Sequence, residues 1–452
     1  MKKLKKKKAS RLYFEKARHR VFSSTSPPKG GSPKSLTQKQ VFSPLLINKY
    51  LLLFFLFLLP TQFGKHFFPS FSYLNGVRVD YLSPTLYLTD IIVFLLFIFN
   101  LKTVINFFKD KKILIGLGLL FINVIFAKNQ SIAFYRLTKI VEFLIVFSLG
   151  QQLFKIVKEK ILLTVLLLTG SFQLILTILQ LIFKHSIQGV FYFFGERLFS
   201  LSTPGIAKAT IQGIEFLRPY GTFSHPNSLA GFFLLLYFFV LTNKKFNKYL
   251  VLKYSVIFIF SCLVFLTFSK VAILTFLILN TLYLVLNTKT SCGICKIARM
   301  VVPLAISLIF LQATTDVLTI EKRIELSKNS LNILSNNLLF GVGLGNYLIA
   351  QARFNSKYLL FFNQPVHNIF LLYLVETGLL TGGLIIVLIA KFIYKIVITN
   401  PYLIFVVLLT GLFDHYWLTL EQNFLLLALI YGSVSRSFLI SRLKLRREVK
   451  YS

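Results

Sequence analysis

The sequence predicts an all-α membrane protein that crosses the bilayer many times. Hydrophobic residues make up 55% of the 452 residues, and the mean hydropathy is +0.71, more than a soluble domain needs. Apolar runs such as 51–59 and 384–390 recur along the chain. Since a spanning helix takes about 20 mostly apolar residues, these runs indicate a polytopic helix bundle.

Residues 1–42 form the most basic segment of the chain. Thirteen Lys and Arg residues face one Glu in the first forty residues, a composition typical of disorder. No small-residue cleavage site follows the first apolar run, so a cleaved signal peptide is not predicted. We expect a cytoplasmic tail against anionic lipid headgroups, each cation contributing up to about 1 kcal/mol.

The net charge of +36 does not predict nucleic-acid binding, because Lys and Arg gather in short segments between apolar runs, as in cytoplasmic loops. Residues 43–440 are expected to form about 12 transmembrane helices. Residues 441–452 would form a second basic cytoplasmic tail, since an even number of spans puts both termini in the cytoplasm. The predicted spans are roughly 44–60, 84–101, 113–127, 138–154, 161–183, 228–243, 254–268, 271–288, 300–315, 367–390, 402–418 and 423–440.

Two long loops are predicted on the outer face, at about 184–227 and 316–366. Loops of this size on one face of a helix bundle are where a membrane enzyme can build a site. Both contain aromatic runs, FYFF at 191–194 and YLLFF at 358–362. These runs are typical of interfacial or re-entrant segments at headgroup depth.

The first long loop ends in RPYGTFSHPN, at the border of an apolar run. Pro226 favours a helix start, with Asn227 or Ser228 as the expected N-cap. Free backbone N–H groups there favour an anion, Arg218 adds a fork-shaped cation, and His225 can donate a hydrogen bond. The alternative is an interfacial arginine that reaches the headgroups, followed by a simple turn.

The second long loop carries further candidates. Arg323 lies on an amphipathic stretch, and His367 follows a proline at the entry of the tenth span. GVGLGN at 341–346 has no βαβ context, so it predicts a turn and close backbone packing rather than a dinucleotide site. Glu376 lies within apolar sequence, where a carboxylate costs on the order of 3 kcal/mol and should face a partner inside the bundle.

The cysteines and the Asp414–His415 pair near the end of the chain indicate little about function. Cys292 and Cys295 form a lone CGIC pair in a basic loop, without the second pair that a zinc site needs. Asp414 and His415 would point about 100° apart on one helix, so we expect packing or hydrogen-bonding roles. Asp414 is able to hold an arginine.

Four stretches together resemble the O-antigen ligase family, which includes related glycan polymerases and protein oligosaccharyltransferases. They occur in family order over roughly 160–430, and the combination is more specific than any one motif. The stretches are RPYGTFSHPNSLAGF, NNLLFGVGLGNYL, HNIFLLYLVETGLL and GLFDHYWLTLEQ.

The resemblance implies a GT-C-like helical fold and a membrane glycosyltransferase. It implies transfer of a glycan from a polyprenyl-diphosphate carrier to an acceptor hydroxyl on the outer face, without metal, nucleotide or other cofactor. By motif, the family's loop arginines fall on Arg218 and Arg323, and its catalytic histidine falls on His367. Where members often show Ser-Arg-Gly, this chain has Lys270 in the middle position, which keeps the charge but loses the fork.

That reaction suits these residue types. Arginines stabilise the diphosphate leaving group, and a neutral histidine assists the incoming hydroxyl. His225, Asn227, Lys270, Glu376 and Asp414 are the possible supporting residues. The expected partners are the lipid-linked donor, a glycan, lipid or protein acceptor, and the bilayer of the plasma (inner) membrane.

Other functions stay open at this stage. A polymerase of the same family would use the same residues. A transporter or flippase of lipid-linked glycans would also be a bundle with buried charge, at Asp90, Glu142, Glu376 and Asp414, but no internal repeat is visible between the halves. A non-catalytic scaffold is the third alternative. The donor glycan and the acceptor cannot be read from the sequence.

Overall fold

The computed structural model describes residues 44–287, 297, 301, 304–305, 307–308, 317–354 and 363–448. The chain divides into two compact units, Met1–Leu46 and Ile47–Ser452, and the second contains every site described below. The predicted N-terminal tail, the CGIC pair, most of the predicted span 300–315 and the YLLFF run lie outside the described residues. Of the predicted C-terminal tail 441–452, residues 441–448 continue helix α18, and only the last four lie outside the described residues.

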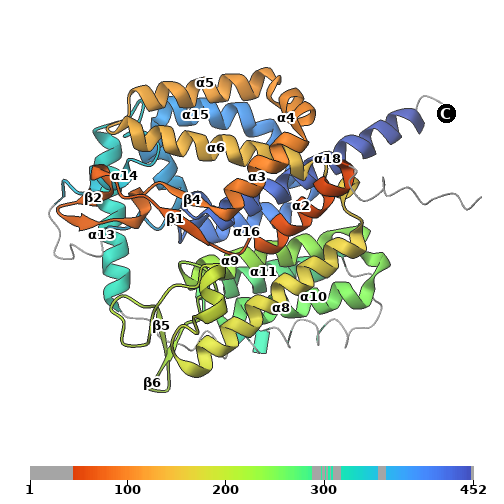
Figure 1. Ribbon diagram of the computed structural model, residues 1–452, viewed down its shortest axis with the longest axis horizontal. Coiled ribbons are helices and arrows are strands. Elements are labelled where there is room, and N and C mark those ends of the chain that lie inside the picture. Colours follow the sequence, from red (N-terminus) through yellow and green to blue (C-terminus); the bar gives the residue numbers. More distant parts are fainter. Residues whose placement is uncertain are drawn as a thin grey trace, which may run out of the picture. The chain divides into compact units, whose positions relative to one another are not determined.

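Helices make up most of the described chain (Figure 1). They are α2 (Pro44–Leu58), α3 (Leu88–Phe99), α4 (Leu101–Phe108), α5 (Lys111–Ile125), α6 (Gln130–Gly150), α7 (Leu153–Ile156), α8 (Glu159–Phe183), α9 (Pro226–Thr242), α10 (Leu250–Leu266), α11 (Lys270–Asn287), α13 (Val317–Ser335), α14 (Tyr347–Gln351), α15 (Ile369–Thr399), α16 (Pro401–Gly411), α17 (Tyr416–Thr419) and α18 (Glu421–Glu448). This confirms a mainly helical protein.

Three of the described helices, α8, α11 and α15, are long and apolar enough to cross a membrane. A fourth span is possible if α3 and α4, which meet at 90°, count as one. The bend lies at Asn100, whose side-chain amide pairs with that of Asn48 at 2.7 and 3.0 Å. The expected total of about 12 spans and the GT-C-like arrangement stay predictions.

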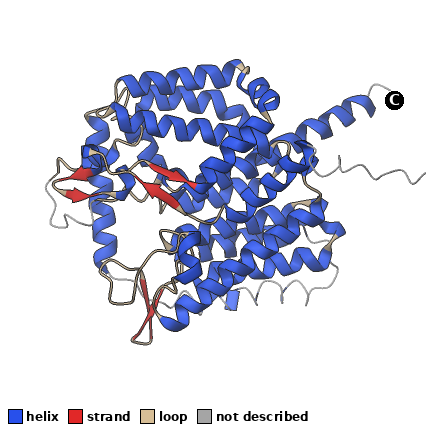
Figure 2. Cartoon of the chain, in the orientation of Figure 1, coloured by secondary structure: helices blue, strands red, loops and turns tan. Residues whose placement is uncertain are grey.

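Three short antiparallel strand pairs accompany the helices (Figure 2). Two of them lie in the loop between α2 and α3, and the third lies in the loop between α8 and α9. The pairs are β1 (Gly64–His66) with β4 (Thr85–Tyr87), β2 (Tyr73–Leu74) with β3 (Val77–Arg78), and β5 (Lys208–Ile211) with β6 (Ile214–Leu217). The loops thus have regular structure of their own.

Helix starts follow local capping chemistry. Asp110, Asn129 and Asn368 accept backbone N–H bonds at the starts of α5, α6 and α15, as short polar side chains do at N-caps. The expectation for α9 was wrong by two or three residues. His225 is the N-cap, and its Nδ1 accepts from the backbone N–H of Asn227 at 3.1 Å.

α9 forms the centre of the largest apolar core. It packs against α10, α11, α16 and α18, and almost its whole length is buried. Gly231 allows the close approach of Tyr416, because a Cβ at this position would collide with the Tyr416 ring. The second turn of α9 is thereby fixed beside α17.

The GVGLGN stretch forms a turn that packs against a break in α15. Gly378 of α15 has φ +70° and ψ 175°, outside the helical region. Gly341 has φ +69°, and a Cβ on either glycine would meet backbone atoms of the other segment. Only glycine fits such a positive-φ close approach, so the predicted turn and close packing are confirmed.

The predicted helical span 402–418 is interrupted between α16 and α17. The sequence predicted one helical span over 402–418, with Asp414 and His415 on it. α16 instead ends at Gly411, and α17 begins at Tyr416. The residues between them leave the helix, so the expectation that Asp414 and His415 diverge as helix neighbours was wrong.

Candidate active site

Asp414 lies at the centre of a buried polar cluster. Its Oδ2 accepts from the side-chain amide of Asn227 at 2.8 Å, and its Oδ1 accepts from the backbone N–H of His415 at 2.8 Å. The residue is 7% exposed. Burial by itself would raise the pKa of Asp414, but the contact with His367 holds the pKa well below its ordinary range. The carboxylate is therefore ionised at neutral pH.

Arg218 joins this cluster through Asn227. Its Nη2 donates to Asn227 Oδ1 at 2.6 Å, and its Nε donates to the Thr267 carbonyl at 2.9 Å. Because a guanidinium only donates and a carboxylate only accepts, the Asn227 amide has one possible orientation. Burial lowers the pKa of Arg218 to about 10, which leaves the side chain positive at neutral pH.

His367 approaches Asp414 from the start of α15. Its Nδ1 lies 3.6 Å from Asp414 Oδ1, longer than a hydrogen bond. This buried nitrogen has no hydrogen-bond partner among the described residues. Asn368 fixes the local backbone, because its Oδ1 caps α15 and its Nδ2 donates to the Leu412 carbonyl at 3.2 Å.

Arg323 reaches the same turn from α13. Its Nη1 donates to the carbonyl of Phe413, the residue before Asp414, at 3.3 Å. Its Nε is buried and lacks a partner in the described part of the chain. The positive charge of Arg323 also contributes to the lowered pKa of Arg218. Both arginines thus approach the Asp414 turn, Arg323 through the Phe413 carbonyl and Arg218 through Asn227.

Two further histidines surround Asp414. Burial lowers the pKa of His225 and of His415 to about 3, so both are neutral at physiological pH. The contacts agree, because His225 Nδ1 accepts a backbone N–H. His415 Nδ1 lies 2.7 Å from Thr419 Oγ1, and its ring centroid lies 5.2 Å from that of His367.

Two groups of described side chains have the atom types and spacing to hold a metal ion. One consists of His367, Asp414 and His415. The other consists of three carboxylates, which already share an ammonium group in the position a cation would take. Lys139 Nζ lies 2.7 Å from Asp90, 3.1 Å from Glu142 and 3.3 Å from Glu421.

Comparison with known families adds the decisive observation. Residues 221–388 match the family model described as O-antigen ligase. This region of the chain is similar to the O-antigen ligase family. Domains of this family belong to ligase- or polymerase-type membrane enzymes of glycan assembly. No curated protein is similar enough in sequence to this chain to count as a relative.

The O-antigen ligase domain supplies most of the cluster, but not all of it. Arg323 and His367 lie within the matched residues, while Arg218 precedes them by three residues and Asp414 follows them by 26. The bond from Asn227 to Asp414 spans 187 positions of the sequence and joins the α16–α17 break to the domain. The cluster is thus completed by the flanking sequence on both sides.

Two expected supporting residues of the O-antigen ligase domain lie elsewhere. Glu376 is on α15 beside the GVGLGN turn, where its backbone carbonyl accepts from Gly343 N at 3.0 Å and from Asn123 Nδ2 at 3.1 Å. Lys270 begins α11, three residues after the carbonyl that holds Arg218. Among the described residues, no hydrogen bond or ion pair joins Lys270 to the cluster.

Sequence reasoning missed two neighbours of the Asp414 cluster. Tyr81, from the loop between α2 and α3, packs its ring edge against His415 at 5.5 Å. Arg136 of α6 donates to the Tyr81 carbonyl at 3.3 Å. Neither has a motif, and their proximity depends on the fold. Lys139 and Glu142 did carry a signal, because opposite charges three apart on an apolar helix indicate a buried pair.

Proposed function

We propose that this chain is a membrane glycosyltransferase that moves a glycan from a polyprenyl-diphosphate carrier to an acceptor hydroxyl. One observation carries the proposal: Arg218, Arg323 and His367 come from three separate segments and meet at the Asp414 turn. The family match of residues 221–388 supports the reaction class. Ligation and polymerisation differ in the acceptor, and the same residues serve both.

The two arginines bind the carrier's diphosphate. Arg218 is held by the Thr267 carbonyl and Asn227, which leaves further N–H donors of its guanidinium for an anion. Arg323 adds a second cation that is anchored only to a carbonyl. Charge develops on the diphosphate as the bond to the sugar breaks, and preorganised donors stabilise that charge.

His367 receives the proton of the acceptor hydroxyl. The hydroxyl oxygen attacks the anomeric carbon, the bond from that carbon to the diphosphate oxygen breaks, and the electron pair leaves with the diphosphate. A sugar hydroxyl is too weak an acid to ionise first, so its proton moves to imidazole during attack. Asp414, 3.6 Å from Nδ1, then stabilises the imidazolium, much as a buried carboxylate does in a triad.

An apolar cavity offers room for part of the carrier's isoprenoid chain. It has a volume of about 400 Å³ and lies between α5, α6, α15 and the start of α18. Its lining includes Arg136 and Thr419, and Thr419 bonds to His415. A chain in this cavity would place its polar end next to the Asp414 turn. The proposal includes that the protein lies in the plasma membrane and that its active site faces the outer side.

The proposal is tested by separating donor binding from transfer in purified variants in lipid nanodiscs. Arg218→Ala and Arg323→Ala should weaken donor binding, and loss of one such donor should slow transfer roughly a hundredfold or more. Arg218→Lys should recover only part of the rate, because the fork is lost. His367→Ala should keep donor binding and lose transfer in a single turnover.

The matched control is Arg78→Ala. Arg78 is also a loop arginine, but it pairs with Asp80 at a surface where both side chains are more than half exposed. This variant should transfer glycan at the parental rate. Parental transfer by His367→Ala, or equal loss of donor binding in His367→Ala and Arg218→Ala, would assign His367 a different role.

A further inference from the structure

The short 3-10 helix η4, Gly189–Phe194, presents an uncovered apolar face. Val190, Tyr192 and Phe193 are 70%, 56% and 65% exposed. Such a cluster of large apolar side chains in one turn marks an interaction surface. The position of η4 on α8 indicates which partner covers this apolar face.

η4 rests on a side of α8 that exposes apolar residues. The rings of Phe191 and Phe194 pack on Phe172 of α8, with centroids 5.6 and 4.8 Å away. Side chains three or four apart share one face of a helix. The largely exposed α8 residues on or next to the face of Phe172 are Leu168, Ile175, Ile182 and Phe183.

The contact lies well within the length of α8. α8 has 25 residues and is one of the helices able to cross a membrane. Phe172 precedes the end of α8 by eleven residues, roughly 16 Å along the axis. Exposed apolar side chains lie on the same face one turn before and one turn after it. η4 is therefore flanked along α8 by surface that lipid must cover.

Hydrogen bonds within the protein hold η4 and the backbone that leads into it. Glu196 is 3% exposed, and its carboxylate accepts from the backbone of Gln188 at 2.5 Å, the backbone of Ile187 at 2.9 Å and the side chain of Gln180 at 2.8 Å. The Phe194 carbonyl accepts from Gln62 N at 3.3 Å. Internal satisfaction of backbone groups is what a segment in lipid requires.

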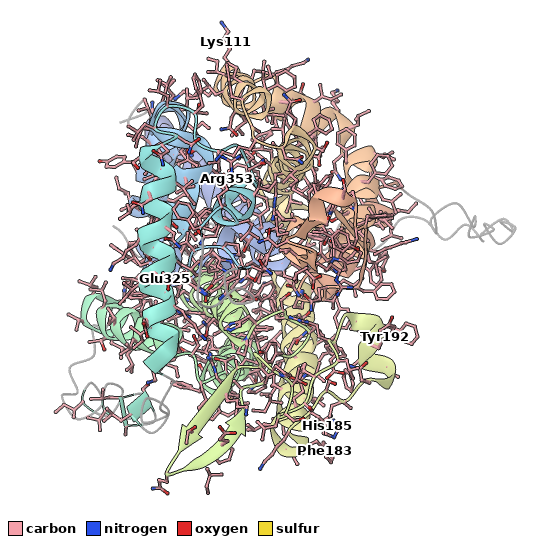
Figure 3. The ribbon with its side chains drawn as sticks, turned by 90° about the vertical axis from the view of Figure 1, so that its left-hand side faces the viewer. Lys111, Phe183, His185, Tyr192, Glu325 and Arg353 are labelled. Atoms are coloured by element: carbon pink, nitrogen blue, oxygen red, sulfur yellow. The ribbon has the colours of Figure 1, made fainter. Side chains whose placement is uncertain are left out.

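Exposed cationic side chains occur on both sides of η4 in the sequence. Lys184 follows the last residue of α8, Arg197 follows η4 closely, and both are exposed. Tyr192 extends outward on the same side of the chain as Phe183 and His185 (Figure 3). Tyrosine and basic residues are enriched where lipid headgroups meet the hydrocarbon.

We propose that η4 inserts into the lipid leaflet that borders the 184–227 loop, with Val190, Tyr192 and Phe193 among the upper acyl chains. The partner is lipid rather than a second protein, because η4 continues the lipid-facing surface of α8. Insertion would fix the depth of the loop that ends in Arg218. The proposal does not depend on glycan transfer, and its test contains no transfer step.

The test uses Phe193→Trp in nanodiscs whose lipids carry bromine on the upper acyl chain. The chain has one tryptophan, Trp417, which is 0% exposed, so the parent protein gives the background. Tyr73→Trp is the matched control, since Tyr73 is a 46% exposed aromatic in a different loop. Tyr192→Trp provides a second reporter if Phe193→Trp does not fold.

We expect bromine to remove most of the added emission of Phe193→Trp, while acrylamide in water has little effect. Tyr73→Trp should respond in the opposite way. Strong acrylamide quenching of Phe193→Trp without bromine quenching would place η4 in water and overturn the proposal. Protection from both quenchers would mean that protein, such as a second copy of the chain, covers η4, and would also overturn it.

Discussion

The Asn227 amide donates to the Asp414 carboxylate at 2.8 Å and accepts from Arg218 on its other side. The amide separates an arginine and an aspartate that would otherwise form an ion pair. It fixes the position of both without cancelling the charge of either. Arg218 is thereby anchored and still able to attract an anionic ligand.

Asn227→Leu should therefore impair transfer without changing the charge of the site. Loss of a hydrogen bond to a charged group costs about 1.5–3 kcal/mol, or roughly tenfold to hundredfold in rate. Asn227→Asp should be at least as slow, because it faces Asp414 with a second carboxylate. Single-turnover transfer measures both, with the exposed Asn336→Leu as control. Full activity of Asn227→Leu would show that the amide does not position Arg218.

Mild acid should destabilise the folded protein. The pKa of His225 and of His415 is about 3 in the fold, against an ordinary 6.5. The unfolded chain takes up these protons as pH falls through 6.5 and the folded chain does not, so stability is full above 6.5 and declines from there towards pH 3. Asp414 adds to the decline only below its ordinary value of 3.8.

Thermal unfolding in detergent at a series of pH values measures this decline. His415→Gln should flatten the dependence between pH 6.5 and about 3, because one of the two groups no longer titrates. His185→Gln, at an exposed histidine, is the control and should leave the dependence unchanged. An equal slope in His415→Gln and the parent would refute the assignment.

Lys139→Met should be among the most destabilising single changes in the bundle. It leaves Asp90, Glu142 and Glu421 without their shared cation, and loss of one partner of a buried pair costs about 3–5 kcal/mol. Lys111→Met, at an exposed lysine, should have little effect. Adding Glu142→Gln and Glu421→Gln to Lys139→Met should restore much of the lost thermal stability, and no rescue would mean that the charges are not the cause.

Two glycines of α15 should respond in opposite ways to alanine. Gly378 has φ +70°, and a Cβ there would collide with the Leu339 carbonyl, so Gly378→Ala should destabilise by roughly 1–3 kcal/mol from the backbone alone. Gly383 has open space around it, and Gly383→Ala should be neutral or stabilise by about 0.5–1 kcal/mol. Equal melting temperatures for the two variants would contradict the break at Gly378.

The predicted sidedness is tested by impermeant thiol labelling in intact cells. In a background with the three native cysteines replaced by serine, Gln212→Cys and Asn336→Cys should be labelled, since both positions are exposed and in the predicted outer loops. Lys155→Cys, exposed in a predicted cytoplasmic loop, should be protected. Protection of both Gln212→Cys and Asn336→Cys from the label would show that the proposed topology is wrong.

The sequence was informative where a signal is local. Apolar runs placed α8, α9 and α11 within a few residues, because burial or lipid contact along a whole helix needs continuous apolar sequence. The right-angle bend at Asn100 was not predictable, since its amide partner, Asn48, is 52 positions away. The run 402–418 is equally apolar on both sides of Asp414, so it reads as one helix.

The same limit applies to the candidate site. Arg218, Arg323 and His367 could be selected from motifs and charge, and the resemblance to a family assigned their roles. Their convergence could not be derived, because it depends on a carboxylate that leaves a helix break and on an amide 187 positions earlier. His225 was expected as a possible supporting residue, and the use of its Nδ1 to cap α9 was not predicted.

Arg323 rests on the Phe413 carbonyl at 3.3 Å, an oxygen that the interrupted helix leaves available. Under the proposed function, an arriving diphosphate must draw the guanidinium away from this carbonyl, and the carbonyl takes it back when the spent carrier leaves. The exchange subtracts the free energy of one hydrogen bond, about 1 kcal/mol, from the affinity for substrate and product alike. A membrane enzyme whose product remains dissolved in the same bilayer at high local concentration would benefit, because a weaker grip shortens the time each site stays occupied by its own product.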